Sequence, residues 1–205
     1  LRANAGSLAP ATHWRLAQKA FRLTADYDRA ISARLARIEW REGEFRDVEA
    51  ALPPLLDLRA PLAQPLRYGE NPHQAAALYS DRSRGIAGAE QLQGKELSYN
   101  NLVDLDAAWQ LVAEFDQPAA AIIKHTNPCG CAEAQTQAES YRKAFECDPV
   151  SAFGGVLAFN RPLEEDTALE IVKTFIEAIA APDYTARALV ILASKKNLRL
   201  LKVTN

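Results

Sequence analysis

The chain has 205 residues, enough for one substantial domain or for one domain and part of another. Its 24 basic and 26 acidic residues leave a formal net charge of -2, which indicates neither a nucleic-acid-binding surface nor an acidic tail. The apolar runs are far shorter than the roughly 18 residues of a transmembrane helix, and no signal peptide is evident, so we expect a cytoplasmic protein without a membrane partner.

Two features of the composition bear on the origin and chemistry of the chain. Methionine is absent and the sequence opens on Leu1, so we expect a fragment of a longer polypeptide. The three cysteines, Cys129, Cys131 and Cys147, are too few for a disulfide framework. Cys129 and Cys131 form a C-x-C pair without a second pair, so we expect no metal and interpret them as small, half-buried residues of a turn; a zinc site is the alternative.

An amphipathic helix is predicted near the start of the chain. Ser7 is the expected N-cap, and Pro10 suits a first helical turn. Apolar residues then recur at helical spacing, at Leu16, Ala20, Leu23, Tyr27 and Ile31. The next segment is rich in charge and is interrupted by Pro53 and Pro54. We therefore assign residues 1–38 to the end of a preceding domain, 39–64 to a linker, and 65–205 to a second domain.

The segment from Leu66 to Gln74 reads Leu-Arg-Tyr-Gly-Glu-Asn-Pro-His-Gln. Polar and aromatic side chains beside glycine and proline are typical of a binding loop. The planar fork of Arg67 suits a phosphate or carboxylate, and the alternative is a surface ion pair. His73 is either part of a site or a structural histidine.

The next stretch contains several glycines but no phosphate-binding loop. Five residues separate Gly88 from Gly94, and Lys95 is followed by Glu96, so the Walker pattern is absent. A helix is predicted after Ser98, and either Asn100 or Asn101 caps it or binds a ligand. Its apolar face comprises Leu105, Ala108, Trp109, Val112 and Phe115.

The most informative stretch follows this helix. Ala119 to Ile123 is an unbroken apolar run, which predicts a strand buried on both faces of an α/β sheet. Lys124 and His125 come next, and Asn127-Pro128 predicts a turn. Because open α/β sheets bind ligands at the carboxyl ends of their strands, we expect a site here. The alternative is a strand-end lysine beside a buried histidine.

The remaining sequence alternates helices and strands, which predicts a layered α/β sheet. Helices are expected around Ala138 to Phe145, from Ala168 to an inward-facing Phe175, and from Ala186 to Ala193. Strands are expected at 156–159, 176–181 and 198–203. Gly154-Gly155 either lets a ligand approach the backbone or makes a tight strand entry. Glu177, a lone acid in an apolar run, is either functional or at an exposed boundary.

Lysine beside histidine suits acyl transfer to a weak amine. Histidine is poised for general base catalysis near neutral pH, and lysine can stabilise an oxyanion or protonate a leaving nitrogen. Successive strand residues point to opposite faces, so both can reach one substrate only if the strand ends at or before Lys124.

Four motifs together resemble those of the AICAR transformylase/IMP cyclohydrolase family of bifunctional purine biosynthesis proteins. They occur in the same order as in the family, and residues 7–35 resemble the end of its cyclohydrolase domain. The motifs are 66–74, Leu97-Ser98-Tyr99-Asn100-Asn101-Leu102, Lys124-His125-Thr126-Asn127-Pro128-Cys129-Gly130 and Ser151-Ala152-Phe153-Gly154-Gly155.

The resemblance implies transfer of a formyl group from the co-substrate 10-formyltetrahydrofolate to the 5-amino group of AICAR. His125 would be the general base, and Lys124 would assist the oxyanion or the leaving nitrogen. Arg67 and Tyr68 would hold the nucleotide, with Arg67 near its phosphate. The other positions implied to contact or shape the pocket are Asn101, Gly154, Glu177 and, with a less defined role, His73.

The resemblance also implies a cytidine deaminase-like fold and a homodimer that builds the site across its interface. The zinc-binding pattern of the deaminases is absent here, so no metal is expected. The cyclohydrolase residues and a second transformylase repeat are missing from the chain. We therefore expect the fragment alone to be inactive, and the alternatives are a non-catalytic nucleotide-binding or dimerisation module and a zinc hydrolase.

Overall fold

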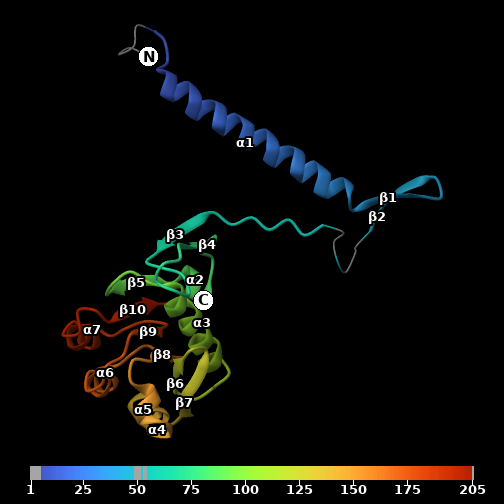
Figure 1. Ribbon diagram of the computed structural model, residues 1–205. Coiled ribbons are helices and arrows are strands. Elements are labelled where there is room, and N and C mark those ends of the chain that lie inside the picture. Colours follow the sequence, from blue (N-terminus) through green and yellow to red (C-terminus); the bar gives the residue numbers. More distant parts are fainter. Residues whose placement is uncertain (1–5, 49–51, 53–54, 205) are drawn as a thin grey trace. The chain divides into compact units, whose positions relative to one another are not determined.

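The computed structural model describes residues 6–48, 52 and 55–204. The chain divides into two compact units, Leu1–Leu58 and Arg59–Asn205, whose elements are coloured along the sequence in Figure 1. Across the described ranges, no helix combines the length and apolar character needed to cross a membrane.

The first unit begins with the long helix α1, Pro10–Leu35. Proline fixes φ near the helical value and lacks an amide that would be unpaired there, which favours Pro10 as the first residue. The N-cap is Ala9, without a side-chain hydrogen bond, so the prediction of Ser7 as N-cap is wrong. The predicted apolar stripe is present, but none of the residues of α1 is buried.

A hairpin follows α1, formed by β1 (Ile38–Arg41) and β2 (Glu44–Asp47). Its two-residue turn, Glu42-Gly43, has positive φ at both positions, as a type I′ turn requires. Except for its first residue, Ile38, the hairpin lies inside the segment 39–64 assigned above as a linker. Pro53 and Pro54 of that segment lie outside the described residues.

The second unit contains the hairpin of β3 (Leu62–Leu66) and β4 (Ala76–Tyr79) and a six-stranded mixed sheet. Strands β8, β9 and β10 run parallel, β6 is antiparallel to its neighbours β7 and β8, and β5 is antiparallel to β10. In spatial order the sheet comprises β5 (Glu90–Gln93), β10 (Arg199–Lys202), β9 (Ala178–Ala181), β8 (Val156–Phe159), β6 (Ala119–Lys124) and β7 (Asn127–Glu133).

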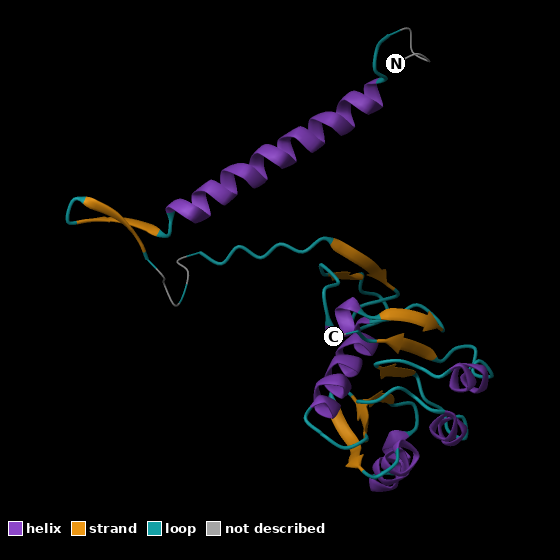
Figure 2. Cartoon of the chain, turned by 180° about the vertical axis from the view of Figure 1, so that it is seen from behind, coloured by secondary structure: helices purple, strands orange, loops and turns teal. Residues whose placement is uncertain are grey.

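Helices cover both faces of this sheet (Figure 2). One face carries α3 (Tyr99–Ala113) and the short α2 (Gly85–Gly88). The opposite face carries α4 (Gln137–Cys147), α6 (Glu165–Ile171), α7 (Ala186–Leu192) and the short α5 (Pro149–Ala152). The predicted layered α/β sheet is thereby confirmed.

The run of apolar residues in β6 is explained by burial on two sides. Ala120 and Ile122 pack in the core beneath α4, whereas Ala121 and Ile123 pack in the core beneath α3. All four are at most 1% exposed. The predicted buried strand is confirmed.

The segment after His125 differs from the prediction. The turn consists of His125 and Thr126, and Asn127-Pro128 begins the edge strand β7. Proline is tolerated there because an edge strand leaves amides without ladder partners. The interpretation of Cys129 and Cys131 as turn residues is likewise wrong, since both belong to β7.

Phe175 is a further correction. Helix α6 ends at Ile171, and Phe175 is 49% exposed instead of facing inward. It lies against Phe153, with the ring centroids 5.4 Å apart. The apolar spacing that predicts a longer helix thus continues four residues past the end of α6.

Candidate active site

Most of the predicted site residues gather where the central strands of the sheet begin or end, at one end of the sheet. Lys124 ends β6, Glu177 directly precedes β9, and Arg199 begins β10. Register places Ile123 opposite Val156, and Ala178 opposite both Val156 and Arg199. Because β6 is antiparallel to β8, this end of the sheet combines the carboxyl end of β6 with the amino ends of β8, β9 and β10. The expectation of a site at carboxyl ends therefore holds only for β6.

The side chain of Lys124 is anchored to the segment that precedes the neighbouring strand β8. Its half-buried side chain extends from the last position of β6, and Nζ donates a hydrogen bond of 3.0 Å to the carbonyl of Phe153. That contact ties the lysine to the segment that enters β8. The ammonium charge is thus held beside Gly154 and Gly155.

His125 lies just beyond the strand, in the two-residue turn between β6 and β7. It is exposed, and its φ is 53°. The strand therefore ends at Lys124, which satisfies the geometric condition set above for both side chains to reach one substrate. The alternative of a buried histidine is excluded.

The loop that contains Arg67 joins β3 to β4 and is tied to the start of α3. Arg67 N donates to Leu97 O at 2.9 Å, and Tyr99 N donates to Tyr68 O at 3.1 Å. Asn100 Nδ2 donates to Glu70 O at 3.1 Å. Asn100 is therefore not the N-cap of α3, and its side chain anchors the loop between β3 and β4.

The side chains of Arg67 and Tyr68 interact with each other. Arg67 Nη2 donates to Tyr68 Oη at 2.8 Å, and the guanidinium carbon lies 4.6 Å from the ring centroid. Arg67 is exposed and Tyr68 is half-buried. The partner of Arg67 is thus an aromatic side chain, and the surface ion pair considered above is not what the structure shows.

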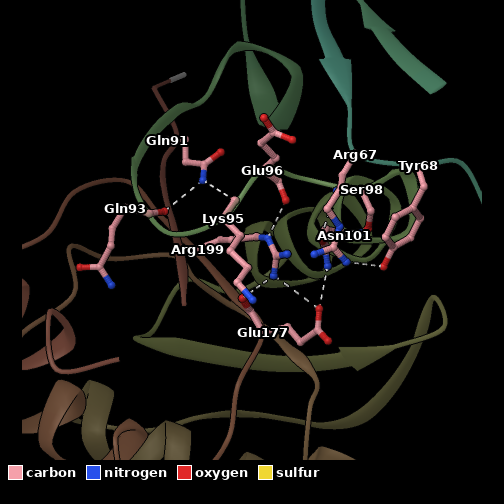
Figure 3. Close-up of polar contacts among 10 residues, drawn as sticks. All are labelled: Arg67, Tyr68, Gln91, Gln93, Lys95, Glu96, Ser98, Asn101, Glu177 and Arg199. Atoms are coloured by element: carbon pink, nitrogen blue, oxygen red, sulfur yellow. Dashed lines mark hydrogen bonds and ion pairs between the residues drawn. The ribbon is translucent and has the colours of Figure 1, made fainter. Parts of the chain in front are cut away.

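Asn101 links the start of α3 to Glu177. The N-cap is Ser98, so the alternative that an asparagine is the N-cap is excluded, and Asn101 occupies position N3 of a capping box. Its Oδ1 accepts bonds from Ser98 N at 3.1 Å and Ser98 Oγ at 3.0 Å. Its Nδ2 donates to Glu177 Oε2 at 3.0 Å (Figure 3).

Arg199 completes this chain of polar contacts (Figure 3). It is 5% exposed, and Nε donates to Glu96 O at 3.1 Å. Nη1 lies 3.6 Å from Glu177 Oε2. Burial lowers the pKa of Arg199, the Glu177 carboxylate raises it, and the nearby Arg67 cation lowers it. The carboxylate of Glu177 is therefore held between an amide and a cation.

The two glycines serve backbone geometry. Gly154 has φ of 74°, a conformation that side chains disfavour, and its amide donates to Phe175 O at 2.8 Å. A Cβ on Gly155 would lie 3.1 Å from Ile122 Cγ2 and 3.2 Å from Ile123 O. Of the two interpretations above, the tight entry into β8 is what the structure shows directly.

Comparison with known proteins agrees with these motifs. Residues 1–205 match the family described as AICARFT/IMPCHase bienzyme. The chain belongs to this family. The bifunctional purine biosynthesis protein PurH of Brucella ovis and that of Brucella canis are each 52% identical to it over 206 residues. PurH of Brucella abortus strain S19 is 52% identical over the same length.

Each of these alignments covers 98% of this chain and 37% of the relative. The chain thus spans about 37% of the length of the curated relatives that it matches. The resemblance found in the four sequence motifs is confirmed at the level of the family.

Two residues of this family member that contribute to the site were missed in the sequence. Arg199 is a cation that begins the apolar strand β10 and is buried there, and the sequence gives no sign of its partner. Asp104 lies on α3, one turn after Asn101, and accepts hydrogen bonds from the backbone of the His125–Thr126 turn. Helical spacing placed it near Asn101, but only the fold brings it to His125.

His73 is not brought into this cluster. It lies in the exposed part of the loop between β3 and β4, and among the residues that the structure describes its side chain has no hydrogen bond or ion pair. Gln74 carries the local structure instead, since Gly69 N donates to its carbonyl and Asn71 N to its Oε1.

The cysteines have the character of packing residues. Cys129 and Cys131 are half-buried and free, and burial raises the pKa of both thiols. Protonated thiols are poor nucleophiles and poor metal ligands. Within the described residues, no group of three His, Cys, Asp or Glu side chains could hold a metal ion.

Proposed function

We propose that this chain carries part of an AICAR transformylase site, which moves a formyl group from 10-formyltetrahydrofolate to the 5-amino group of AICAR in purine biosynthesis. One observation carries the proposal. Lys124 and His125 stand at the end of the buried strand β6. The elements that bear Asn101, Gly154 and Glu177 converge at the same end of the sheet.

The roles of the two ionisable residues follow from charge and position. His125 accepts a proton from the amine as its nitrogen bonds to the formyl carbon. Lys124 stabilises the negative charge that develops on the formyl oxygen and gives a proton to the departing folate nitrogen. The exposure of His125 and the fixed position of the Lys124 ammonium support this division.

The nucleotide has complementary groups nearby. Arg67 supplies an exposed cation for the ribose 5′-phosphate. Tyr68 holds the guanidinium of Arg67 through a hydrogen bond to its hydroxyl and a contact with its ring. Asn101 and Glu177 offer an amide and a carboxylate for polar groups of the base or ribose, and Gly154 shapes the wall. We assign His73 to the same loop without a defined contact.

The chain also offers a surface suited to the folate co-substrate. Phe153 and Phe175 are 59% and 49% exposed and lie against each other, and the carbonyl of Phe153 accepts the hydrogen bond from Lys124. Exposed aromatic rings provide a stacking surface for a planar heterocycle.

The wider assignments belong to the same proposal. Residues 1–38 correspond to the end of an IMP cyclohydrolase domain, 39–64 to a linker that contains a hairpin, and 65–205 to the first part of a cytidine deaminase-like transformylase domain. The complete polypeptide is a cytoplasmic homodimer that also closes the ring to IMP and completes the site with residues outside this chain.

Titration calorimetry of AICAR into the chain tests the nucleotide assignment. We expect heat of binding that is weakened by Arg67→Ala and unaffected by Arg15→Ala on α1, because only Arg67 belongs to the proposed phosphate contact. Equal affinity of the chain and its Arg67→Ala variant would refute that contact. Binding without formyl transfer by the complete polypeptide would instead favour a non-catalytic nucleotide-binding module.

A further inference from the structure

The turn that carries His125 has an unfavourable backbone. Both of its residues have positive φ, 53° for His125 and 60° for Thr126. A two-residue hairpin turn of this kind is normally built with Asn-Gly or Gly-Gly, which tolerate the left-handed region. Thr126 is β-branched, the residue class for which that region is most restrictive. The local sequence does not by itself explain the turn.

Asp104 supplies what the local sequence lacks. It lies half-buried on α3, and Oδ1 accepts a hydrogen bond of 2.8 Å from Thr126 N. Oδ2 accepts a longer bond of 3.4 Å from His125 N. In the left-handed conformation of this turn both amides face one carboxylate, whose charge-assisted hydrogen bonds stabilise that conformation.

Other contacts in the turn act on a different group. Thr126 Oγ1 and Asn127 Nδ2 both donate to the carbonyl of His125, at 2.7 Å and 2.8 Å. Asp104 is therefore the acceptor for the two turn amides. It lies on α3 near Leu105 and Ala108, which are fully buried. The position of the turn is thus set by the core.

We propose that Asp104 is a positioning residue that holds the His125–Thr126 turn in its left-handed conformation and so fixes where the imidazole stands. The catalytic consequence rests on the proposed function of His125. The conformational claim does not, and it is tested separately on the chain as it stands.

Hydrogen exchange of the Thr126 amide tests the conformational claim. We expect exchange about tenfold or more faster in Asp104→Ala, because the amide loses its acceptor. Asp104→Asn keeps the side-chain shape and one acceptor oxygen, so Thr126 exchange in this variant should lie between that of the unsubstituted chain and that of Asp104→Ala. This variant also provides a test if Asp104→Ala fails to fold. The matched control is Asp106→Ala on the same helix, whose carboxylate accepts from Gln110 Nε2 at 2.6 Å. Unchanged Thr126 exchange in both Asp104 variants would overturn the proposal.

Rescue by glycine tests the catalytic consequence in the complete polypeptide. Asp104→Ala should lower kcat by up to about 10²-fold with a smaller change in KM for AICAR, since the base is displaced but the nucleotide contacts remain. Adding Thr126→Gly should restore much of kcat, because glycine adopts positive φ without a carboxylate to hold it. Loss of kcat without rescue would mean that Asp104 acts directly. If the unmodified polypeptide transfers no formyl group, the proposed function fails while the exchange result still decides the role of Asp104.

Discussion

Glu177 shows how a partly exposed carboxylate can be fixed by its neighbours. Its side chain is 41% exposed, yet Asn101 donates to it from α3 and the buried Arg199 lies beside it from β10. Both neighbours are in turn committed elsewhere, Asn101 to the capping box and Arg199 to Glu96 O. The carboxylate therefore faces the sheet edge in one orientation before any ligand arrives.

Replacing Asn101 by aspartate is expected to set two carboxylates against each other. At neutral pH the free energy of unfolding should fall by about 1–3 kcal/mol, because a donor becomes a like charge. The shared site raises the pKa of one carboxylate in the folded state, so stability is lost as pH rises through that pKa. The difference in the free energy of unfolding between the variant and the unsubstituted protein should accordingly shrink as pH falls toward about 4. Denaturant titration at several pH values measures this.

Asn100→Asp is the control for that substitution. Asn100 is the exposed neighbour, whose amide bonds only to the carbonyl of Glu70 in the described structure. It should show a small loss of stability with no recovery in acid. A deficit of Asn101→Asp that does not depend on pH would contradict the charge argument.

His125→Ala in the complete polypeptide is expected to lower turnover by roughly 10²–10⁴-fold, because a general base contributes about that much. Steady-state formyl transfer measures it, with AICAR affinity determined in parallel. His13→Ala, on the exposed helix α1, is the matched histidine control. Turnover of His125→Ala equal to that of the control would remove His125 from the mechanism.

At the scale of elements, β7 is pressed closely against α4. A Cβ on Gly130 would fall inside the van der Waals radius of the Ala144 carbonyl and lie 3.0 Å from Cys147 Cβ. The glycine thus permits the close approach of an edge strand to a helix. No rotation of a side chain can relieve such an overlap with backbone.

Gly130→Ala is therefore expected to lower the free energy of unfolding by about 1–3 kcal/mol, the usual cost of overpacking a well-packed site. Thermal or denaturant unfolding measures the change. Glu133→Ala, at an exposed position of the same strand, should cost less than about 0.5 kcal/mol. If the two variants are equally stable, strand and helix are not in fixed contact.

The elements that could be predicted from the sequence are those with a strong apolar signal. Strands β6 and β8 are buried on both faces and read as continuous apolar runs. Strands β5 and β7 lie at the two edges of the sheet. The sequence of β5 is mostly polar and that of β7 contains proline and glycine, so both resemble loops. The His125–Thr126 turn was missed for a related reason, because its conformation depends on Asp104 from another element.

Candidate site residues divide in the same way. Arg67, Asn101, Lys124 and His125 stand in motifs that are recognisable along the chain. Arg199 and Asp104 act through partners that are distant in sequence, Glu177 and Glu96 for the first and the β6–β7 turn for the second. Pattern alone indicates that such a residue is unusual but cannot name its partner.

At the scale of the whole molecule, the chain contains only one part of the proposed site, and it spans about 37% of the length of its relatives. We expect the 205-residue chain alone to show negligible formyl transfer, because the proposed function assigns the remaining nucleotide and folate contacts to residues outside this chain. A formyl-transfer assay that follows the formylated product measures this. Transfer by the chain near the rate of the complete polypeptide would refute the half-site interpretation.

Helix α3 carries Asn101 and Asp104 three residues apart, one facing Glu177 and the other facing the turn of His125. Their relation is one of helical phase. An α-helix rotates by about 100° per residue, so a single insertion between these two positions would turn one of them away from its partner. An insertion beyond the last turn of α3 would leave both in place. The tolerance of this protein to insertions and deletions is thus set by the phase of one helix as much as by the identity of its side chains.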